Sequence, residues 1–172
     1  MIEFVESGMT FSFTDSDAFH IEKCPAYLTM QKNLKICECI AVRPEQKQLL
    51  LLEAKSSFSN PELYIENFDK NVTDITQKVI NTLLLYYGLL LNRPYKEGST
   101  LPPALRRDSF CNNQYKIIPV LIINNFQEEW IPPVKDALNN AIKKLFFSKL
   151  LLLEDMQVLT KEMAIKFRIV KE

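Results

Sequence analysis

Alternating apolar and polar residues predict short strands in the first third of the chain. Residues 10–13 and 18–22 are aromatic or β-branched pieces, separated by a turn-forming Asp-Ser-Asp segment. Residues 34–42 and 49–55 are longer apolar runs, with the polar residues 43–47 between them. Two such runs joined by a short polar loop are typical of a β-hairpin. The second run opens with four leucines, but its brevity and the flanking turns favour a buried strand over a helix.

After residue 61 the spacing changes to that of a helix. Apolar residues recur three or four positions apart, which predicts the buried face of a long helix that ends near Asn92. The residues of this face are Phe68, Val72, Ile75, Val79, Leu83 and Tyr86. The polar residues 95–113, which include two prolines and two adjacent arginines, are expected to form a long loop.

The last third of the chain adds a strand, a helix and a shorter closing portion. Residues 117–123 are strongly apolar and predict a strand, and residues 130–147 have helical periodicity with two prolines near the first turn. A further strand is expected within residues 150–159, and a helical turn or strand within residues 161–170. This order predicts an α/β fold, a single domain over residues 1–172 in which helices flank a mixed β-sheet.

Composition excludes several ways of binding phosphate. Only 3 residues are Gly, and no glycine-rich nucleotide-binding pattern occurs. The 21 Lys and Arg residues balance the 21 Asp and Glu residues, which argues against a protein that coats nucleic acid through bulk positive charge. An enzyme that meets phosphate in one local cleft stays open, because metal ions can supply positive charge there.

The remaining composition favours a cytoplasmic protein. Cys24, Cys37, Cys39 and Cys111 lack the spacing of a zinc site, so buried free thiols are expected. No cationic and apolar leader opens the chain, and a reduced, cytoplasmic setting is predicted. The longest apolar stretch, residues 83–91, is too short to span a bilayer. We expect it to be a core segment or a homodimer surface, with no membrane contact.

Glu53 and Lys55 carry the candidate chemistry. They lie two residues apart on a predicted strand, so their side chains share one face while Ala54 points the other way. A carboxylate buried in such a strand needs a partner charge or a metal ion. Glu53 could therefore hold Mg²⁺ or Mn²⁺, which prefer oxygen ligands. In a hydrolytic site, Lys55 could orient or deprotonate the attacking water, or neutralise the charge of the transition state.

Two further acids can complete such a site. Glu38 lies among apolar residues on the partner strand of the hairpin, where a lone acid is not explained by solubility. A short hairpin brings it near Glu53 if both side chains use the same face of the sheet. Glu22 ends an earlier strand candidate, and His20, the only His, would share its face. We expect His20 to be a surface or packed residue rather than a catalytic one.

Three segments together resemble the PD-(D/E)xK nuclease superfamily. They read FHIEK at residues 19–23, KICECI at 35–40 and LEAKSS at 52–57, similar to small bacterial members with IEKS, EFI and EAKSS segments. The resemblance implies a restriction-endonuclease-like core, with Glu38 and Glu53 as metal ligands and Lys55 as the catalytic lysine. It also implies Glu22 as an extra acid, Mg²⁺ or Mn²⁺ as cofactor, and nucleic acid, DNA rather than RNA, as substrate.

The chain departs from the superfamily pattern at three points. The usual Asp of the first hairpin strand is Glu38 here, and Cys24 stands where the pattern has Ser. The usual N-terminal helix that donates the extra acid is replaced by predicted strands, which leaves the role of Glu22 open.

Lys78 and Gln77 are candidate substrate-binding residues. They lie on the predicted long helix, from which helix residues of this fold can reach the site. Lys78 could contact a phosphate there. The alternative for both residues is a solvated helix face.

Each candidate also has an interpretation without a site. Glu53 and Lys55 can be an exposed ion pair on an edge strand, which would contribute little stability. Glu38 can be a solvated edge residue, and Glu22 can pair with Lys23 at the surface. For the protein as a whole, one alternative is a binding or interaction module on the nuclease fold that has lost catalysis. The other is an unrelated α/β domain in which Glu-Ala-Lys occurs by chance.

Overall fold

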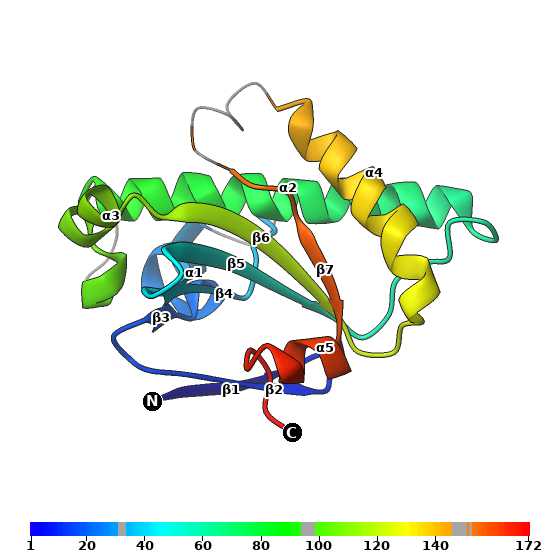
Figure 1. Cartoon of the computed structure of the whole chain (residues 1–172). Coiled ribbons are helices and arrows are strands. Elements are labelled where there is room, and N and C mark those ends of the chain that lie inside the picture. The colour runs from blue at the N-terminus through cyan, green and yellow to red at the C-terminus, as the bar shows by residue number, and fades with distance from the viewer. Residues whose placement is uncertain (31–33, 94–98, 146–150, 152) are drawn as a thin grey trace.

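A five-stranded mixed sheet forms the centre of the protein in a computed structural model, which describes residues 1–30, 34–93, 99–145, 151 and 153–172 (Figure 1). The strands are ordered β3 (Ala18–Phe19), β4 (Cys39–Arg43), β5 (Gln48–Lys55), β6 (Lys116–Ile123) and β7 (Gln157–Thr160). The pairs β3–β4 and β4–β5 are antiparallel, whereas the pairs β5–β6 and β6–β7 are parallel. Parallel neighbours need crossover connections, and helices provide them here.

Two helices cover one face of this sheet. α2 (Ile65–Leu90) lies in the connection from β5 to β6, and α4 (Ile131–Lys143) lies in the connection from β6 to β7. Both helices run on the same side of the sheet in Figure 1. Ile75 of α2 and Leu138 of α4 belong to one buried cluster with Leu51 of β5.

The N-terminal hairpin and the C-terminal helix cover the opposite face. β1 (Ile2–Glu6) and β2 (Met9–Phe13) form an antiparallel ribbon, and α5 (Lys161–Lys166) lies beside it in Figure 1. Phe11 of β2 belongs to a second buried cluster, together with Leu50 and Leu52 of β5. Successive residues of β5 therefore pack on opposite faces, as expected for a central strand buried on both sides.

The strongest apolar patterns are confirmed. The four leucines of β5 are at most 3% exposed, because both clusters enclose them, and this packing outweighs their modest strand propensity. α2, β6 and α4 lie where the periodicity predicts them, although residues 146–147 of the second predicted helix are outside the described residues. β7 overlaps the end of the range 150–159 expected for a last strand, and α5 is the helical alternative of the helical turn or strand expected over residues 161–170.

Three predictions about the first third are wrong or incomplete. The strand expected over residues 18–22 is only β3, because the 3₁₀ helix η1 (Ile21–Lys23) and α1 (Pro25–Met30) follow it. Pro25 begins α1, since its fixed φ suits a first helical turn. The strand expected over residues 34–42 begins only at Cys39, and β1 was not predicted at all.

The long loop predicted for residues 95–113 is wrong over its second half. The 3₁₀ helix η2 (Pro103–Leu105) and α3 (Arg107–Asn113) occupy it, whereas residues 95–98 lie outside the described part. Leu101 and Leu105 are buried, and the hydroxyl of Tyr86 on α2 donates to the carbonyl of Leu105 at 3.0 Å. Phe110 of α3 also packs edge-on against Tyr86 and Tyr87, so apolar contacts hold this mostly polar segment against α2.

Within the described residues, no helix has the length and apolarity needed to cross a bilayer. The apolar stretch 83–91 lies at the end of α2 and is mainly a core segment. Leu83, Leu85, Tyr86, Leu89 and Leu90 are buried, while Leu84 and Leu91 are exposed.

Replacing Tyr86 by Phe tests whether η2 is part of the folded core. Tyr86→Phe removes the hydroxyl that donates to Leu105 and leaves a buried carbonyl without this partner. We expect the free energy of unfolding, measured by urea denaturation, to fall by about 1 kcal/mol. Tyr64→Phe is the matched control, because Tyr64 is 58% exposed, and it should leave stability unchanged. Equal stabilities of the two variants would contradict this anchoring of η2.

Candidate functional site

Glu38 and Glu53 come from the two arms of the β4–β5 hairpin. Cys39 pairs with Leu52 in the ladder, and the amide of Glu38 donates to the carbonyl of Leu52 at 2.9 Å. Strand pairing therefore continues as far as Glu38. Only 6% of Glu38 and 1% of Glu53 is exposed. The hairpin thus holds two buried acids at the end of the sheet where β5 finishes.

Lys78 of α2 joins these two carboxylates. Its Nζ atom lies 2.7 and 2.9 Å from the two carboxylate oxygens of Glu53, and 3.5 Å from Oε1 of Glu38. The lysine side chain is only 14% exposed, so water is largely excluded from the ion pair. Both acids therefore reach a cation on the helix-covered side of the sheet, which is the convergence that a shared site requires.

A threonine on α2 fixes the chain just before Glu38. Oγ1 of Thr82 accepts a hydrogen bond from the amide of Cys37 at 2.8 Å. The same hydroxyl donates to the carbonyl of Lys78, one helical turn earlier, at 2.7 Å. Because Cys37 directly precedes Glu38, these two bonds relate the position of the acid to that of the lysine. They also explain why strand β4 does not extend back to residue 34.

Lys55 lies at the rim of the same site. Its Nζ atom is 3.9 Å from Oε1 of Glu53, and its side chain is 36% exposed. Ala54, between the two charged residues, packs into the cluster on the other face of the sheet, as the strand alternation predicts. Lys55 can therefore meet a solvent-borne molecule while its neighbour Glu53 stays buried.

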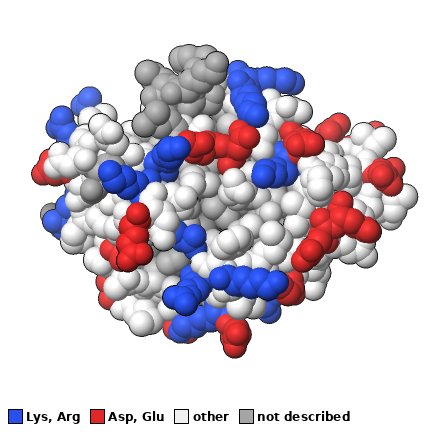
Figure 2. All heavy atoms as spheres, viewed as in Figure 1, with Lys and Arg blue, Asp and Glu red and all other residues white. Residues whose placement is uncertain are grey.

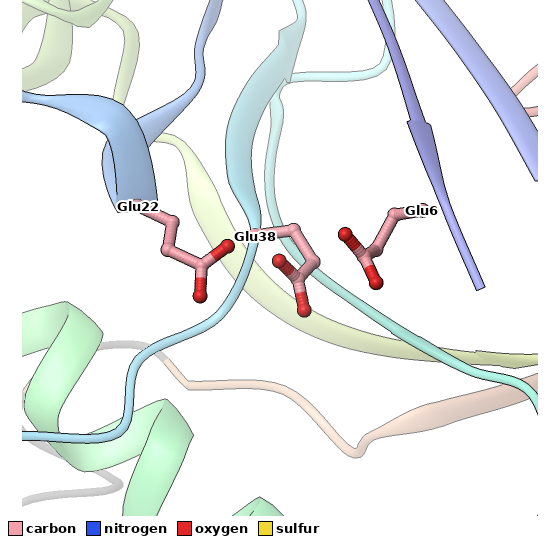
Figure 3. Close-up of side chains that lie close together, drawn as sticks. All are labelled: Glu6, Glu22 and Glu38. Carbon is pink, nitrogen blue, oxygen red and sulfur yellow. The ribbon is translucent and has the colours of Figure 1, made fainter.

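Two more carboxylates converge on Glu38. The side chains of Glu22 and Glu6 point toward it in Figure 3, and the nearest oxygens of these three acids all lie within 4.8 Å of one another. Glu22 comes from η1, whose backbone reaches the hairpin through a bond from the Glu22 amide to the Glu38 carbonyl at 3.4 Å. Glu6 ends β1. The predicted extra acid thus lies beside Glu38, and Glu6 joins the acidic cluster of Glu6, Glu22 and Glu38.

Glu6 is the member of this cluster that the sequence analysis missed. It precedes Ser7-Gly8, a dipeptide that commonly marks a turn between strands. That signal could have indicated an N-terminal hairpin. Nothing in the sequence places this hairpin beside residue 38, since the two segments are more than thirty residues apart.

Burial changes the acidity of both hairpin carboxyls. Burial, a hydrogen bond with Glu22 and the charge of Glu53 raise the pKa of Glu38 to about 9. Burial also raises the pKa of Glu53, but the nearby Lys78 limits the rise to about 7. Burial alone would lower the pKa of Lys78, yet the two carboxylates raise it above its ordinary value. Lys78 therefore stays charged, and the acids retain protons more strongly than exposed acids do.

The acids fit the preferences of a hard divalent cation. Mg²⁺ takes oxygen ligands at about 2.0–2.1 Å, so two oxygens on one ion lie at most about 4.2 Å apart. Neighbouring ligands of an octahedral ion lie only about 2.9 Å apart, so the three oxygens, which lie within 4.8 Å of one another, would have to move closer together to bind one ion. A cation here would also offset the cost of burying Glu38, whose nearest ammonium is 3.5 Å away.

Gln77 and His20 contact residues other than the two buried acids. The side chain of Gln77 is exposed, and its amide donates to Oδ1 of Asn81 along the helix at 2.8 Å. His20 stacks on Phe4 with ring centroids 4.3 Å apart, and burial lowers its pKa. The stacking on Phe4 agrees with the expectation of a surface or packed His.

The cysteines are free thiols. Cys24, Cys37 and Cys39 are buried, as expected, whereas Cys111 is exposed. None of them belongs to the acidic cluster that the described residues form. Thiolate ligation of a soft metal therefore has no support at this site.

Comparison of the chain with protein-family models, with curated proteins and with solved structures found no significant match. No relative therefore assigns a role to any of these side chains. Chemical inference at this site starts from its own distances, burial and charges.

Lys78→Met tests the buried ion pair. The substitution keeps length and helix propensity but removes the ammonium that neutralises Glu53. We expect the free energy of unfolding of the metal-free protein to fall by about 3 kcal/mol at pH 8, because a buried carboxylate loses its partner. The loss should shrink at pH 5, where Glu53 can bind a proton instead. Urea denaturation measures both values.

Lys70→Met is the control for this measurement, since Lys70 is exposed on the same helix. Its effect on stability should be within about 0.5 kcal/mol. If the two lysine variants lose equal stability, the ion pair with Glu53 contributes no more than a surface charge.

The pH dependence of stability tests the raised pKa of Glu38. The folded protein holds this proton up to about pH 9, whereas the ordinary pKa is 4.5. Between these values the folded state binds more protons than the unfolded state, so stability must fall as pH rises. We expect the Tm of the metal-free protein to fall more steeply between about pH 5 and pH 9 than that of Glu38→Gln. Parallel Tm profiles would contradict a raised pKa.

Proposed function

We propose that the protein is a Mg²⁺- or Mn²⁺-dependent phosphodiesterase that cleaves nucleic acid, DNA in preference to RNA. The observation that carries this proposal is the convergence of Glu38 and Glu53 from adjacent arms of one hairpin, with Lys55 beside them. This is the set of residues expected from the PD-(D/E)xK resemblance. Glu22 reaches the same place from the preceding element.

The order and pairing of the elements support a restriction-endonuclease-like core. An antiparallel hairpin, β4–β5, carries the acids, a long helix follows it, and the next strand of the sheet runs parallel to β5. The candidate residues lie near the carboxyl end of β5. At this end of the sheet, Lys78 of α2 and Glu6 of the N-terminal hairpin both approach the hairpin acids. A site at a strand end is open to a ligand while its base is held by the core.

Each side chain has a role in the proposed reaction. Glu38 and Glu22 would hold the metal ion, with Glu53 as a further ligand beside Lys78. The bound ion would supply Lewis-acid chemistry, neutralising a phosphate oxygen and making the attacking water more acidic. Lys55 is exposed enough to hold that water or to stabilise charge on the phosphate. Lys78, engaged with Glu53, favours the charged form of this carboxylate and holds it in place.

Substrate affinity in this proposal depends on local contacts rather than on a broad basic surface. Figure 2 shows Lys and Arg interspersed with Asp and Glu on the face in view, and the formal net charge is zero. Long-range attraction of a polyanion is therefore weak. Metal-mediated contact with a single phosphate suits such a surface better than a continuous electrostatic track.

A binding module on the same fold is the second candidate function. The observation that favours it is the position of Lys78, whose ammonium contacts both carboxylate oxygens of Glu53. An acid neutralised in this way needs no metal ion. Calorimetry with Mn²⁺ separates the candidates: the enzyme should bind the ion and lose binding in Glu53→Ala, whereas the module should bind none.

The activity itself is tested with single- and double-stranded DNA and RNA in Mg²⁺ and in Mn²⁺. We expect cleavage that requires the metal ion, and a loss of about 100-fold or more in Lys55→Ala, because the variant lacks the group next to the reacting phosphate. Lys116→Ala is the control, since Lys116 is 62% exposed at the other end of the sheet. Equal rates in the two lysine variants would mean that the site is misassigned or that a contaminant cuts.

A further inference from the structure

The turn between β1 and β2 brings the N-terminal hairpin to the candidate site. Glu6 pairs with Met9, so Ser7 and Gly8 alone form the turn. Their φ angles are 52° and 73°, the left-handed conformation that a two-residue hairpin turn requires. Such a turn is short and stiff, so the direction of Glu6 depends on where the turn is held.

Asn124 holds this turn against the sheet. Its side-chain amide donates to the carbonyl of Ser7 at 2.9 Å, and its backbone amide donates to the carbonyl of Lys55 at 2.9 Å. The hydroxyl of Ser7 adds a bond to the carbonyl of Ala54 at 3.2 Å. One residue after β6 therefore connects the hairpin turn with the end of the strand that carries Lys55.

The contact between the turn and Asn124 is close. A Cβ atom at Gly8 would lie 2.7 Å from Nδ2 of Asn124, which is nearer than real Cβ atoms approach. A glycine at position 8 therefore permits both the positive φ and the close contact with Asn124. Any larger residue would push the turn away from the amide or strain the backbone.

Glu6 depends on this turn for its position. The amide of Ser7 donates to Oε1 of Glu6 at 3.2 Å, and the Glu6 carboxylate joins Glu22 and Glu38 within 4.8 Å. The chain from the Asn124 amide through the Ser7 backbone to the Glu6 carboxylate is therefore continuous. Moving the turn moves the acid away from the other two.

We infer that Asn124 is a positioning residue that sets Glu6 as an additional metal ligand of the proposed site. The inference rests on the proposed function for the metal, but the contact of Asn124 with the hairpin does not. In this arrangement the N-terminal hairpin covers one face of the sheet and also contributes the Glu6 carboxylate to the site. Asn124 connects the turn that follows Glu6 with the backbone of Lys55.

A double-mutant cycle read by Mn²⁺ calorimetry tests this role. We expect Asn124→Ala to weaken Mn²⁺ binding about tenfold, as loss of a residue that orients a ligand typically does. In a Glu6→Gln background the same substitution should have no further effect, because the residue it positions is already lost. Asn125→Ala is the matched control, since Asn125 is the exposed neighbour, and it should leave affinity unchanged. An equal loss in both backgrounds, or no loss, overturns the inference.

Hydrogen exchange of the metal-free protein reports the hairpin contact separately. Asn124→Ala should increase exchange of the amides in residues 2–13, and Asn125→Ala should not. Gly8→Ala should reproduce the effect of Asn124→Ala by displacing the turn. Unchanged exchange in Asn124→Ala overturns the positioning role whatever the metal does. If the native protein binds no Mn²⁺, both the proposed function and the role of Glu6 as a metal ligand are wrong. The hydrogen-exchange result still shows whether Asn124 holds the hairpin turn.

Discussion

The ion pair between Lys78 and Glu53 couples the long helix to the central strand. Glu53 is 1% exposed, and burying it as an isolated charge would be too costly. The Lys78 ammonium at 2.7 Å is therefore required for an acid to be buried at this position near the end of β5. Thr82, one turn along α2, then fixes the segment before Glu38. The helix therefore determines the positions of both hairpin acids, and the sheet beneath them determines their shared face.

Carboxylates still outnumber ammonium groups around Glu38 after Lys78 pairs with Glu53. Glu6, Glu22 and Glu38 lie together, and the nearest ammonium to Glu38 is the same Lys78, at 3.5 Å. Burial, the hydrogen bond with Glu22 and the charge of Glu53 together raise the pKa of Glu38. A proton or a cation can relieve this excess of carboxylates, which is why a metal ion is the simplest addition to the site. The acidic cluster is thereby centred on Glu38, whereas Glu53 pairs with Lys78 of the helix.

Much of the fold could be predicted from the sequence because its elements follow simple periodicities. The leucine run of β5, the stripe along α2 and the apolar β6 each have one favourable way to bury their side chains. The segments that were misread are those whose structure depends on distant partners. Leu105 lies in a polar stretch whose sequence predicts a loop. It forms part of η2, where it is buried and its carbonyl accepts a hydrogen bond from the hydroxyl of Tyr86.

The sequence by itself determined that Glu53 and Lys55 share a face, because side-chain direction along a strand follows from its two-residue period. It also placed Glu38 on the partner strand of the hairpin, but the register that sets Glu38 opposite Glu53 came from the structure. Only the tertiary structure decided that Lys78 neutralises Glu53, that Gln77 points elsewhere and that Glu6 joins the acids. These relations join segments far apart in the chain. Their distances are set by how α2 and the β1–β2 turn pack on the sheet, which local periodicity does not encode.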